Sequence, residues 1–397
     1  MTMKDNIKSK FTVDIISGSR ADFGLLQPAY LAMRADKSFH PRFVITGAHL
    51  EKAFGNTIQF IEKEKCEIAG KVKLNIKQTD PASINTYIAR AVEGFSKQFA
   101  SNRPDAILVL GDRYEIFAAA IAAYVLQIPV MHIHGGETSA GAFDEGFRHS
   151  ISKLSYLHFV TCDTHKQRLQ AMGEQPKRVF NVGALAVDNI RNFSLLSKEA
   201  LSTDLGIDLN GPSALLTYHP VTLEPRTSHK QLMQLFDALN KLPELAVIFN
   251  TSNADTDGDI LNKAIRDFVA NRPNTVLVPS LGTQRFLSVL SNVDLMIGNS
   301  SAGLIEMPFF KHPTINIGDR QKGRMKPATV IDCTNDTAAI VKAIRKGLSP
   351  AFVKECRKVK YPFGKGNTAQ QMLRIIKREL VKVDLKKVFF DNEVYGI

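Results

Sequence analysis

The stretch from Val293 to Pro308 constrains the fold more tightly than any other part of this chain. It opens with the apolar run Val293–Ile297, which is typical of a strand buried on both faces of a parallel sheet. Gly298-Asn299-Ser300-Ser301 then supplies small residues and side-chain oxygens where a following helix needs capping. Such a corner leaves backbone N–H groups at the positive end of a helix, which suits a phosphate, and Glu306 follows where a carboxylate can reach a sugar hydroxyl. The alternative is that Ser300 and Ser301 are ordinary helix caps.

The same order of apolar run, polar turn and helix recurs along the chain. Apolar runs that predict strands occur at 11–17, 43–46, 72–76, 105–110, 129–133, 157–161, 179–182, 214–218, 245–249, 276–278, 293–297 and 314–317. Helical patterns separate these runs, and this alternation favours an α/β fold with doubly wound parallel sheets. A chain of 397 residues is long for one domain, so we expect two, connected through residues 195–212, where the pattern loosens.

The composition narrows the possible partners. The net charge of +12 comes from 51 Lys and Arg residues against 39 Asp and Glu, which suits an anionic substrate. No nucleic-acid-binding motif accompanies the charge, so no nucleic-acid partner is expected. The four cysteines are far apart in the sequence, which predicts free thiols. No secretory signal and no apolar run of membrane-spanning length is present, so we expect a cytoplasmic location and no membrane partner.

Polar residues follow the predicted strands of the first half, at the sheet edge where ligands of doubly wound folds bind. Arg20 follows the first strand and can grip a phosphate, unless it only pairs with Asp22. Asp112 follows a buried strand directly after a glycine, where its alternative role is to cap the next helix. Glu137 follows two glycines that let a ligand approach the backbone closely. Asp112 and Glu137 are therefore candidate site residues.

Two further pairs in the first half are ambiguous. Asp144 and Glu145 lie in the first turn of a predicted helix, where compensation of the helix dipole is the simpler interpretation. His132 and His134 share one face of a predicted strand, but no third ligand stands at a suitable spacing. The histidine pair is interpreted as packing residues, and no metal site is predicted.

The second half offers a histidine and a basic loop. His219 ends the strand 214–218, and its place at the seam between two domains favours a role in binding or catalysis. Arg320, Lys322 and Arg324 follow the strand 314–317 in a glycine-punctuated loop. Such a loop can clamp a diphosphate, although a solvated basic loop is the alternative.

Together these motifs resemble the UDP-N-acetylglucosamine 2-epimerase family, and specifically its hydrolysing branch. The matching motifs cover nearly the whole chain in the expected order: Gly18-Ser19-Arg20-Ala21-Asp22-Phe23-Gly24, Gly111-Asp112-Arg113, His132-Ile133-His134-Gly135-Gly136-Glu137, Asp144-Glu145 with Arg148-His149, His219-Pro220-Val221-Thr222-Leu223-Glu224, Asn253-Ala254-Asp255-Thr256-Asp257-Gly258, Gly298-Asn299-Ser300-Ser301 and Asn316-Ile317-Gly318-Asp319-Arg320-Gln321-Lys322-Gly323-Arg324. The His-Gly-Gly-Glu run and the Arg-Gln-Lys-Gly-Arg loop indicate the hydrolysing branch.

The resemblance implies two Rossmann-like domains that face each other across a cleft, the glycosyltransferase-B architecture, with no metal or redox cofactor. Residues 1–195 would form the domain that carries the catalytic carboxylates, and residues 196–370 would bind UDP. Residues 371–397 would form a C-terminal helix and tail that return to the first domain. The family also implies a homodimer.

The resemblance assigns roles residue by residue. Asp112, Glu137 and Glu145 would be the acid/base carboxylates, and His219 would bind or protonate the departing phosphate. The residues that would hold UDP are Arg20, Arg113, His219, Asn253, Ser300, Ser301, Glu306 and Arg320, with Glu306 on the ribose. Ala302 departs from the family pattern, because a third serine is expected there, but backbone N–H groups can still bind phosphate.

The family reaction expels UDP from a UDP-N-acetylhexosamine, forms a glycal and hydrates it to a free sugar inverted at C2. The product would be N-acetylmannosamine or the equivalent 2,4-diacetamido-6-deoxy sugar for nonulosonic acid synthesis, and the sequence leaves both open. A glycosyltransferase of the same architecture is the enzymatic alternative, and it would require an acceptor site. A non-catalytic protein that binds nucleotides or nucleic acid is the remaining alternative.

Overall fold

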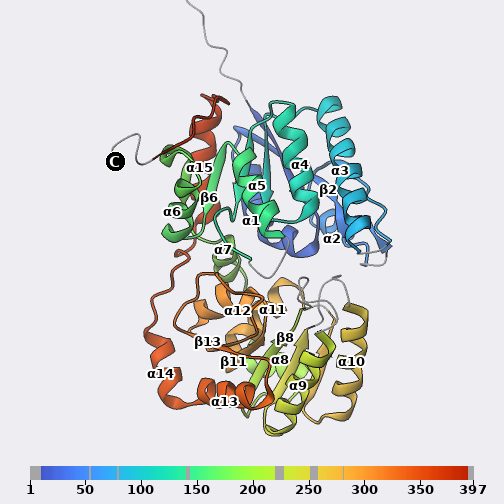
Figure 1. Cartoon of the computed structure of the whole chain (residues 1–397), viewed down its shortest axis with the longest axis vertical. Helices are drawn as coiled ribbons and strands as arrows, with labels where there is room; N and C mark the ends of the chain where they lie inside the picture. The colour runs from blue at the N-terminus through green and yellow to red at the C-terminus, as the bar shows by residue number, and fades with distance from the viewer. Residues whose placement is uncertain are drawn as a thin grey trace, which may run out of the picture. The chain divides into compact units, whose positions relative to one another are not determined.

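The computed structural model describes residues 10–52, 55–77, 80–139, 144–219, 228–250, 258–279 and 281–391. The described residues form two compact units, and each unit is built on a parallel β-sheet flanked by helices (Figure 1). Those of the first unit fall within 1–137, 144–188 and 363–397, and those of the second within 138–143 and 189–362. The predicted α/β class with two Rossmann-like domains is confirmed. No helix in the described ranges is both long and apolar enough to cross a bilayer.

The sheet of the first unit has the strand order β3-β2-β1-β4-β5-β6-β7, and every pairing is parallel. Its strands are β1 (Phe11–Ser17), β2 (Phe39–Thr46), β3 (Ile68–Val72), β4 (Ala106–Leu110), β5 (Val130–Ile133), β6 (Leu157–Val160) and β7 (Val179–Asn181). Its helices are α1 (Arg20–Ala35), α2 (Ile58–Lys63), α3 (Pro81–Ser101), α4 (Tyr114–Val125), α5 (Asp144–Leu154), α6 (Asp163–Ala171), α7 (Leu185–Asn192), which runs on into the second unit, and α15 (Thr368–Leu380). Short 3-10 turns occur at Gly47–Leu50 and Pro176–Arg178.

The sheet of the second unit is also parallel, with the order β10-β9-β8-β11-β12-β13. Its strands are β8 (Ser213–Thr217), β9 (Ala246–Asn250), β10 (Thr275–Val278), β11 (Leu295–Gly298), β12 (Thr314–Ile317) and β13 (Val330–Cys333). Its helices are α8 (Lys198–Leu205), α9 (Ser228–Asn240), α10 (Gly258–Asn271), α11 (Gly282–Asn292), α12 (Ala302–Ile305), α13 (Thr337–Leu348) and α14 (Pro350–Lys358), with a 3-10 turn, η4, at Met307–Phe310.

The strand orders identify where ligands should bind in each sheet. In the first sheet the winding direction reverses between β1 and β4, and in the second it reverses between β8 and β11. Ligands of open parallel sheets bind beyond the carboxyl ends of the strands at such a switch point, because the flanking loops diverge there. The residues that follow these four strands are therefore the first place to search for a site.

The last helix, α15, packs on the first unit although it is distant in sequence. Met372 and Ile376 of α15 are fully buried in the same apolar core as Tyr30 and Met33 of α1. Asp188 accepts hydrogen bonds from the first two N–H groups of α15, at 2.9 Å from Thr368 and 2.7 Å from Ala369. These N–H groups have no partner within the helix, so the carboxylate satisfies them and offsets the helix dipole.

Two local predictions differ from the structure. The strand predicted at 72–76 lies at Ile68–Val72, because it pairs with β2 there and Asn75 adopts a left-handed φ of 56° that ends the extended chain. The segment 195–212, predicted as a loose connection, contains helix α8. Ser197 caps the start of α8, and Gly206 ends it in the left-handed region with φ 66°, a common helix stop.

Candidate active site

Two glycine-dependent turns bring the carboxylates of the first unit to the sheet edge. Gly111 follows β4 with φ 79°, a conformation that disfavours other residues, and it turns the chain into Asp112. After β5 the chain turns through Gly136 with φ 75°, where a Cβ would collide with the backbone oxygen of His165. Glu137 follows that glycine and is almost fully buried. A buried carboxylate needs a compensating partner, because burial disfavours its charge.

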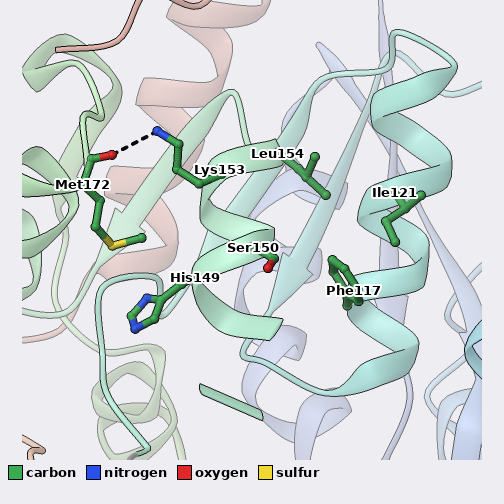
Figure 2. A pocket seen from close by; sticks show the side chains of 7 residues that line it. All are labelled: Phe117, Ile121, His149, Ser150, Lys153, Leu154 and Met172. Atoms are coloured by element: carbon green, nitrogen blue, oxygen red, sulfur yellow. Dashed lines mark hydrogen bonds between the residues drawn. The ribbon is translucent and has the colours of Figure 1, made fainter. Parts of the chain in front are cut away.

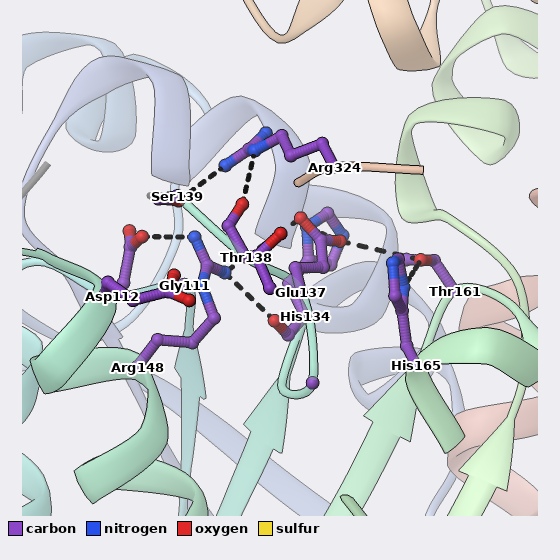
Figure 3. Close-up of polar contacts among 12 residues, drawn as sticks. Gly111, Asp112, His134, Glu137, Thr138, Ser139, Arg148, Thr161, His165 and Arg324 are labelled. Carbon is purple, nitrogen blue, oxygen red and sulfur yellow. Dashed lines mark hydrogen bonds and ion pairs between the residues drawn. The ribbon is translucent and has the colours of Figure 1, made fainter. Parts of the chain in front are cut away.

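Arg148 supplies that partner and lies at the centre of the polar cluster (Figure 3). Its side chain is only 3% exposed. One Nη donates to the Asp112 carboxylate, while the other donates to the His134 carbonyl at 3.0 Å and lies 3.9 Å from Glu137 Oε2. A planar guanidinium presents several donors in a fixed fork, so Arg148 fixes Asp112 and Glu137 relative to each other.

The second oxygen of Glu137 faces two further partners. Its Oε1 lies 3.2 Å from His134 Nδ1 and 3.5 Å from the Thr161 hydroxyl. Thr161 lies in turn 2.8 Å from His165 Nδ1, and burial lowers the pKa of His165 to about 4. His165 is therefore neutral near pH 7. His134 has a left-handed φ of 66°, which is uncommon for a residue with a side chain and occurs more often at functional sites.

Asp144, for which the sequence favours compensation of the helix dipole, lies close to the charge of Asp112. It is the first residue of α5, one turn before Arg148. Burial, and then the nearby charge of Asp112, raise the pKa of Asp144 to about 6. Asp144 thus belongs to the same cluster of charges as Asp112. Its neighbour Glu145 lies on another side of the helix, with Oε1 3.1 Å from His149 Nε2.

His132 serves the framework of this cluster. Its Nε2 lies 2.8 Å from the Gly111 carbonyl and its Nδ1 lies 3.2 Å from the Ser152 hydroxyl. Burial lowers the pKa of His132 to about 3, so the ring is neutral. Across the described residues, no three His, Cys, Asp or Glu side chains are grouped so that they could hold a metal ion.

The edge beyond β1 carries the predicted phosphate-binding arginines. The guanidinium of Arg20 lies 4.0 Å from the centre of the Phe60 ring, in a cation–π contact. Arg113 Nε donates to Glu115 Oε1 at 2.6 Å, and Glu115 raises the pKa of Arg113. A Cβ on Gly18 would lie 2.5 Å from the same Glu115 oxygen. The buried Glu115 therefore fits only because residue 18 is glycine, and this partner of Arg113 was not predicted.

In the second unit Asn299 joins the ends of three strands. Its side chain accepts from the His219 backbone N–H at 2.7 Å and donates to the His219 carbonyl at 2.8 Å. Its own carbonyl accepts from Arg320 Nη1 at 3.0 Å and from Gln321 Nε2 at 2.7 Å. Asn299 belongs to the turn Gly298-Asn299-Ser300-Ser301, which we name the serine turn. It thus brings His219, Arg320 and the serine turn together, as the sequence predicted for His219 and Arg320.

The serine turn leads into a short helix. Ser300 Oγ accepts from the Ala302 N–H at 3.4 Å, and the helix that follows, α12, has only four residues. Glu306 stands between α12 and the next 3-10 turn, and its charge adds to burial in raising the pKa of Tyr361. Ser301 is the residue before α12 and makes no side-chain cap. Asn253 lies outside the described residues.

Arg324, in the predicted basic loop, contacts the two residues that follow Glu137. Its Nε donates to the Thr138 carbonyl at 2.9 Å and its Nη2 donates to the Ser139 hydroxyl at 3.1 Å (Figure 3). Thr138 and Ser139 directly follow Glu137 and belong to the second unit. Arg324 therefore contacts the Thr138 backbone and the Ser139 side chain, and the diphosphate clamp in this loop stays a prediction.

An apolar pocket lies away from this cluster, between α4 and α5 (Figure 2). Its lining residues are Phe117, Ile121, His149, Ser150, Lys153, Leu154 and Met172. Neither Asp112 nor Glu137 lines it, and its surface is mostly apolar. Its polar lining residues are His149, Ser150 and Lys153, and the predicted UDP-binding residues do not line it.

Comparison with known proteins gives the family. A family model described as UDP-N-acetylglucosamine 2-epimerase matches residues 31–377. A relative from Campylobacter jejuni, named GDP/UDP-N,N'-diacetylbacillosamine 2-epimerase (hydrolyzing), is 40% identical over 82% of this chain and 84% of its own length. The polysialic acid biosynthesis protein P7 of Escherichia coli is 36% identical over 95% of this chain and 96% of its own length.

The fold agrees with these matches. The solved structure of UDP-GlcNAc 2-epimerase from Neisseria meningitidis, bound to UDP-GlcNAc, superposes with a TM-score of 0.79 and 17% identity. The match covers 93% of this chain and 100% of the Neisseria meningitidis chain. The sequence matches, which span most of both proteins, carry the assignment of family, and the structural match carries the fold. The chain belongs to the UDP-N-acetylglucosamine 2-epimerase family, in its hydrolysing branch.

Proposed function

We propose that the protein is a hydrolysing 2-epimerase that converts a UDP-N-acetylhexosamine into UDP and a free sugar inverted at C2. The observation that carries the proposal is the contact of one buried arginine, Arg148, with both Asp112 and Glu137. Two carboxylates held at fixed positions can remove and return protons at neighbouring carbons. The names of the similar proteins support the same reaction class.

The reaction has two steps, an elimination and a hydration. In the first, the C1–O bond breaks, UDP leaves with the bonding electrons, and a base removes the C2 proton to form the C1=C2 bond of a glycal. In the second, water adds its oxygen to C1, and C2 receives a proton on the opposite face. Developing positive charge at C1 in the first step is stabilised by nearby carboxylates, as in glycosidases.

We assign the proton transfers to Asp112, Glu137 and Asp144, with the predicted Glu145 in a supporting position beside His149. Arg148 contacts both Asp112 and Glu137, and we assign the removal of the C2 proton to this pair. Burial and the charge of Asp112 raise the pKa of Asp144 to about 6, which suits it to deliver a proton in the second step. His219 would interact with the departing phosphate.

The second unit would hold UDP. The His219, Arg320 and serine-turn groups that Asn299 joins lie at the switch point of its sheet, and Glu306, which follows α12, would bind the ribose. Arg20 and Arg113 of the first unit supply further positive charge for the diphosphate, and Asn253 remains a predicted contact. Residues 1–195 and 371–397 would thus serve sugar chemistry, and residues 196–370 would serve UDP binding.

The substrate is either UDP-N-acetylglucosamine or a UDP-2,4-diacetamido-6-deoxy sugar, since similar proteins are named for diacetylbacillosamine and for polysialic acid. We further propose a cytoplasmic homodimer. The exposed apolar residues Tyr124 and Val125 at the end of α4, which are 57% and 72% exposed, support self-association.

Release of UDP without an acceptor tests the proposal. Each UDP-sugar is incubated with the protein alone, and UDP is quantified by anion-exchange chromatography. We expect release to go to completion with one of the two substrates. Release that requires an added sugar or lipid acceptor would instead identify a glycosyltransferase.

A further inference from the structure

The segment Asp384–Phe390, which we name the C-terminal strap, follows α15 and lies along the first unit. In Figure 1 the end of the red C-terminal segment runs beside α6. Arg178 donates to the Asp384 carbonyl at 3.0 Å and to the Lys386 carbonyl at 3.1 Å. The Phe390 N–H donates to the Gly173 carbonyl at 2.8 Å. The strap is thus fixed at both ends.

Between these two points Lys387 reaches the C-terminal end of α5. Its ammonium donates to the carbonyls of Lys153 at 2.9 Å and Ser155 at 3.0 Å, with the Ser152 carbonyl at 3.4 Å. The last carbonyls of a helix have no partner within it and carry the negative end of its dipole. Lys387 therefore caps α5 from a distant part of the chain.

A buried carboxylate fixes Lys387 in place. Glu174 is fully buried, and its Oε2 lies 2.5 Å from Lys387 Nζ and 2.9 Å from His158 Nε2. Its Oε1 lies 2.7 Å from Lys153 Nζ. An ammonium has three N–H donors, and four acceptors surround that of Lys387: the Glu174 carboxylate and the carbonyls of Ser152, Lys153 and Ser155.

The capped end of α5 is connected to the carboxylate cluster through Ser152. The Ser152 carbonyl faces Lys387, while its hydroxyl donates to the Arg148 carbonyl at 3.0 Å and lies 3.2 Å from His132 Nδ1. His132 in turn contacts the carbonyl of Gly111, the residue before Asp112. Ser152 thus contacts both Lys387 of the strap and the groups that position Arg148 and Asp112.

We propose that the C-terminal strap fixes α5 along its axis so that Arg148 holds Asp112 and Glu137 in their reactive positions, with Lys387 as the positioning residue. The inference rests on the proposed function, because it assumes that these carboxylates act on the sugar. A shift of α5 would move the Arg148 fork and leave UDP-binding residues of the second unit unaffected. Lys387 therefore acts on turnover rather than on UDP affinity.

The test uses full-length Lys387→Met, which keeps the length of the side chain and removes its donors. Wild-type protein is first assayed for release of UDP, and a wild type without turnover would refute the proposed function itself. For Lys387→Met we expect kcat to fall by about 10-fold to 100-fold, the range for a displaced catalytic group, with KM and the UDP Kd changed by less than about 2-fold. Lys387→Arg, which keeps the charge and the donors, should recover most of that loss.

Two comparisons make the result decisive. Lys386→Met is the matched control, because Lys386 is an exposed lysine on the same strap, and its kcat should equal that of the wild type. Glu174→Gln serves as the second variant if Lys387→Met unfolds, and it should lower kcat in the same manner. An unchanged kcat in Lys387→Met, or an equal fall in kcat and UDP affinity, would overturn the inference while the proposed function stands.

Discussion

The side chain of Asn299 brackets the backbone of His219, accepting from its N–H at 2.7 Å and donating to its carbonyl at 2.8 Å. This pair joins the ends of β8 and β11 at the switch point of the second sheet. Because an amide is both donor and acceptor, only asparagine at this position satisfies both backbone groups.

Asn299→Asp should weaken UDP binding and lower stability. The carboxylate cannot donate to the His219 carbonyl, and a lost hydrogen bond to a buried group costs about 1–3 kcal/mol. Isothermal titration with UDP and urea unfolding measure the two effects. The account would be contradicted by an Asn299→Asp protein with wild-type UDP affinity, because the position of His219 depends on the Asn299 side chain.

Arg148→Lys should lower turnover by about 100-fold or more and leave the UDP Kd near that of the wild type. The lysine keeps the positive charge but loses the fork that holds Asp112 and Glu137 together. Steady-state kinetics and UDP titration separate the two quantities. Arg191→Lys, an exposed arginine on α7, is the matched control and should behave as the wild type.

Asp144→Asn should reduce kcat more than Glu145→Gln. Asp144 lies within the electrostatic reach of Asp112, whereas Glu145 pairs with His149 on the helix surface. Loss of a proton-transfer group typically costs about 10²–10⁴-fold, so the two variants are separable by a simple rate assay. A larger loss in Glu145→Gln would return the role to the residue that the sequence resemblance assigned.

Gly18→Ala should impair both folding and substrate binding. The added methyl would meet Glu115 Oε1 at 2.5 Å, so the carboxylate must leave its position against Arg113. We expect a higher KM for the UDP-sugar and a lower midpoint of thermal unfolding. The variant Gly18→Ala/Glu115→Gln, which keeps the collision but removes the ion pair, should show a similarly high KM, whereas recovery of the wild-type KM would argue against a role for Glu115.

Acid should remove the stability that Glu174 contributes. Burial tends to raise the pKa of Glu174, but His158, Lys153 and Lys387 outweigh it and lower that pKa from 4.5 to about 2. A lowered carboxyl pKa stabilises the folded state above pH 4.5, and this contribution is lost as the pH falls towards 2. Between pH 4.5 and pH 2 the free energy of unfolding should therefore fall further in the wild type than in Glu174→Gln. The difference between the two falls should be about 2–3 kcal/mol. The free energy of unfolding is measured by urea titration at several pH values. An equal pH dependence in the wild type and in Glu174→Gln would contradict this linkage.

Much of the fold could be predicted because its signals are local. Buried apolar runs such as Val293–Ile297 predict parallel strands on their own, and the polar residue after each run identifies the edge where ligands bind. The two parallel sheets confirm the predicted fold class, and the comparisons with known proteins confirm the family and the hydrolysing branch that the motifs resemble. The division at residues 195 and 370, the homodimer and the individual site residues stay predictions.

The rest of the site depends on contacts between distant segments, which spacing does not reveal. Arg148 was noted only as part of a motif, because its contacts with Asp112 and Glu137 arise from the packing of α5 on the sheet. The choice between Asp144 and Glu145 depends on which side of one helical turn faces Asp112, and adjacent residues differ by about 100° there. The strap contact joins Glu174 and Lys387, which are separated in the sequence by residues 189–362 of the second unit.

The most direct test of the central claim is a proton NMR time course in D2O with UDP-N-acetylglucosamine and the UDP-diacetamido sugar in separate samples. The account predicts UDP together with a free sugar that is inverted at C2 and carries deuterium there, from one of the two samples. The variants Asp112→Asn and Glu137→Gln should still bind UDP, but they should release almost no UDP and almost no free sugar from the substrate. An inverted sugar still attached to UDP, or a free sugar that retains its C2 proton, would contradict the account.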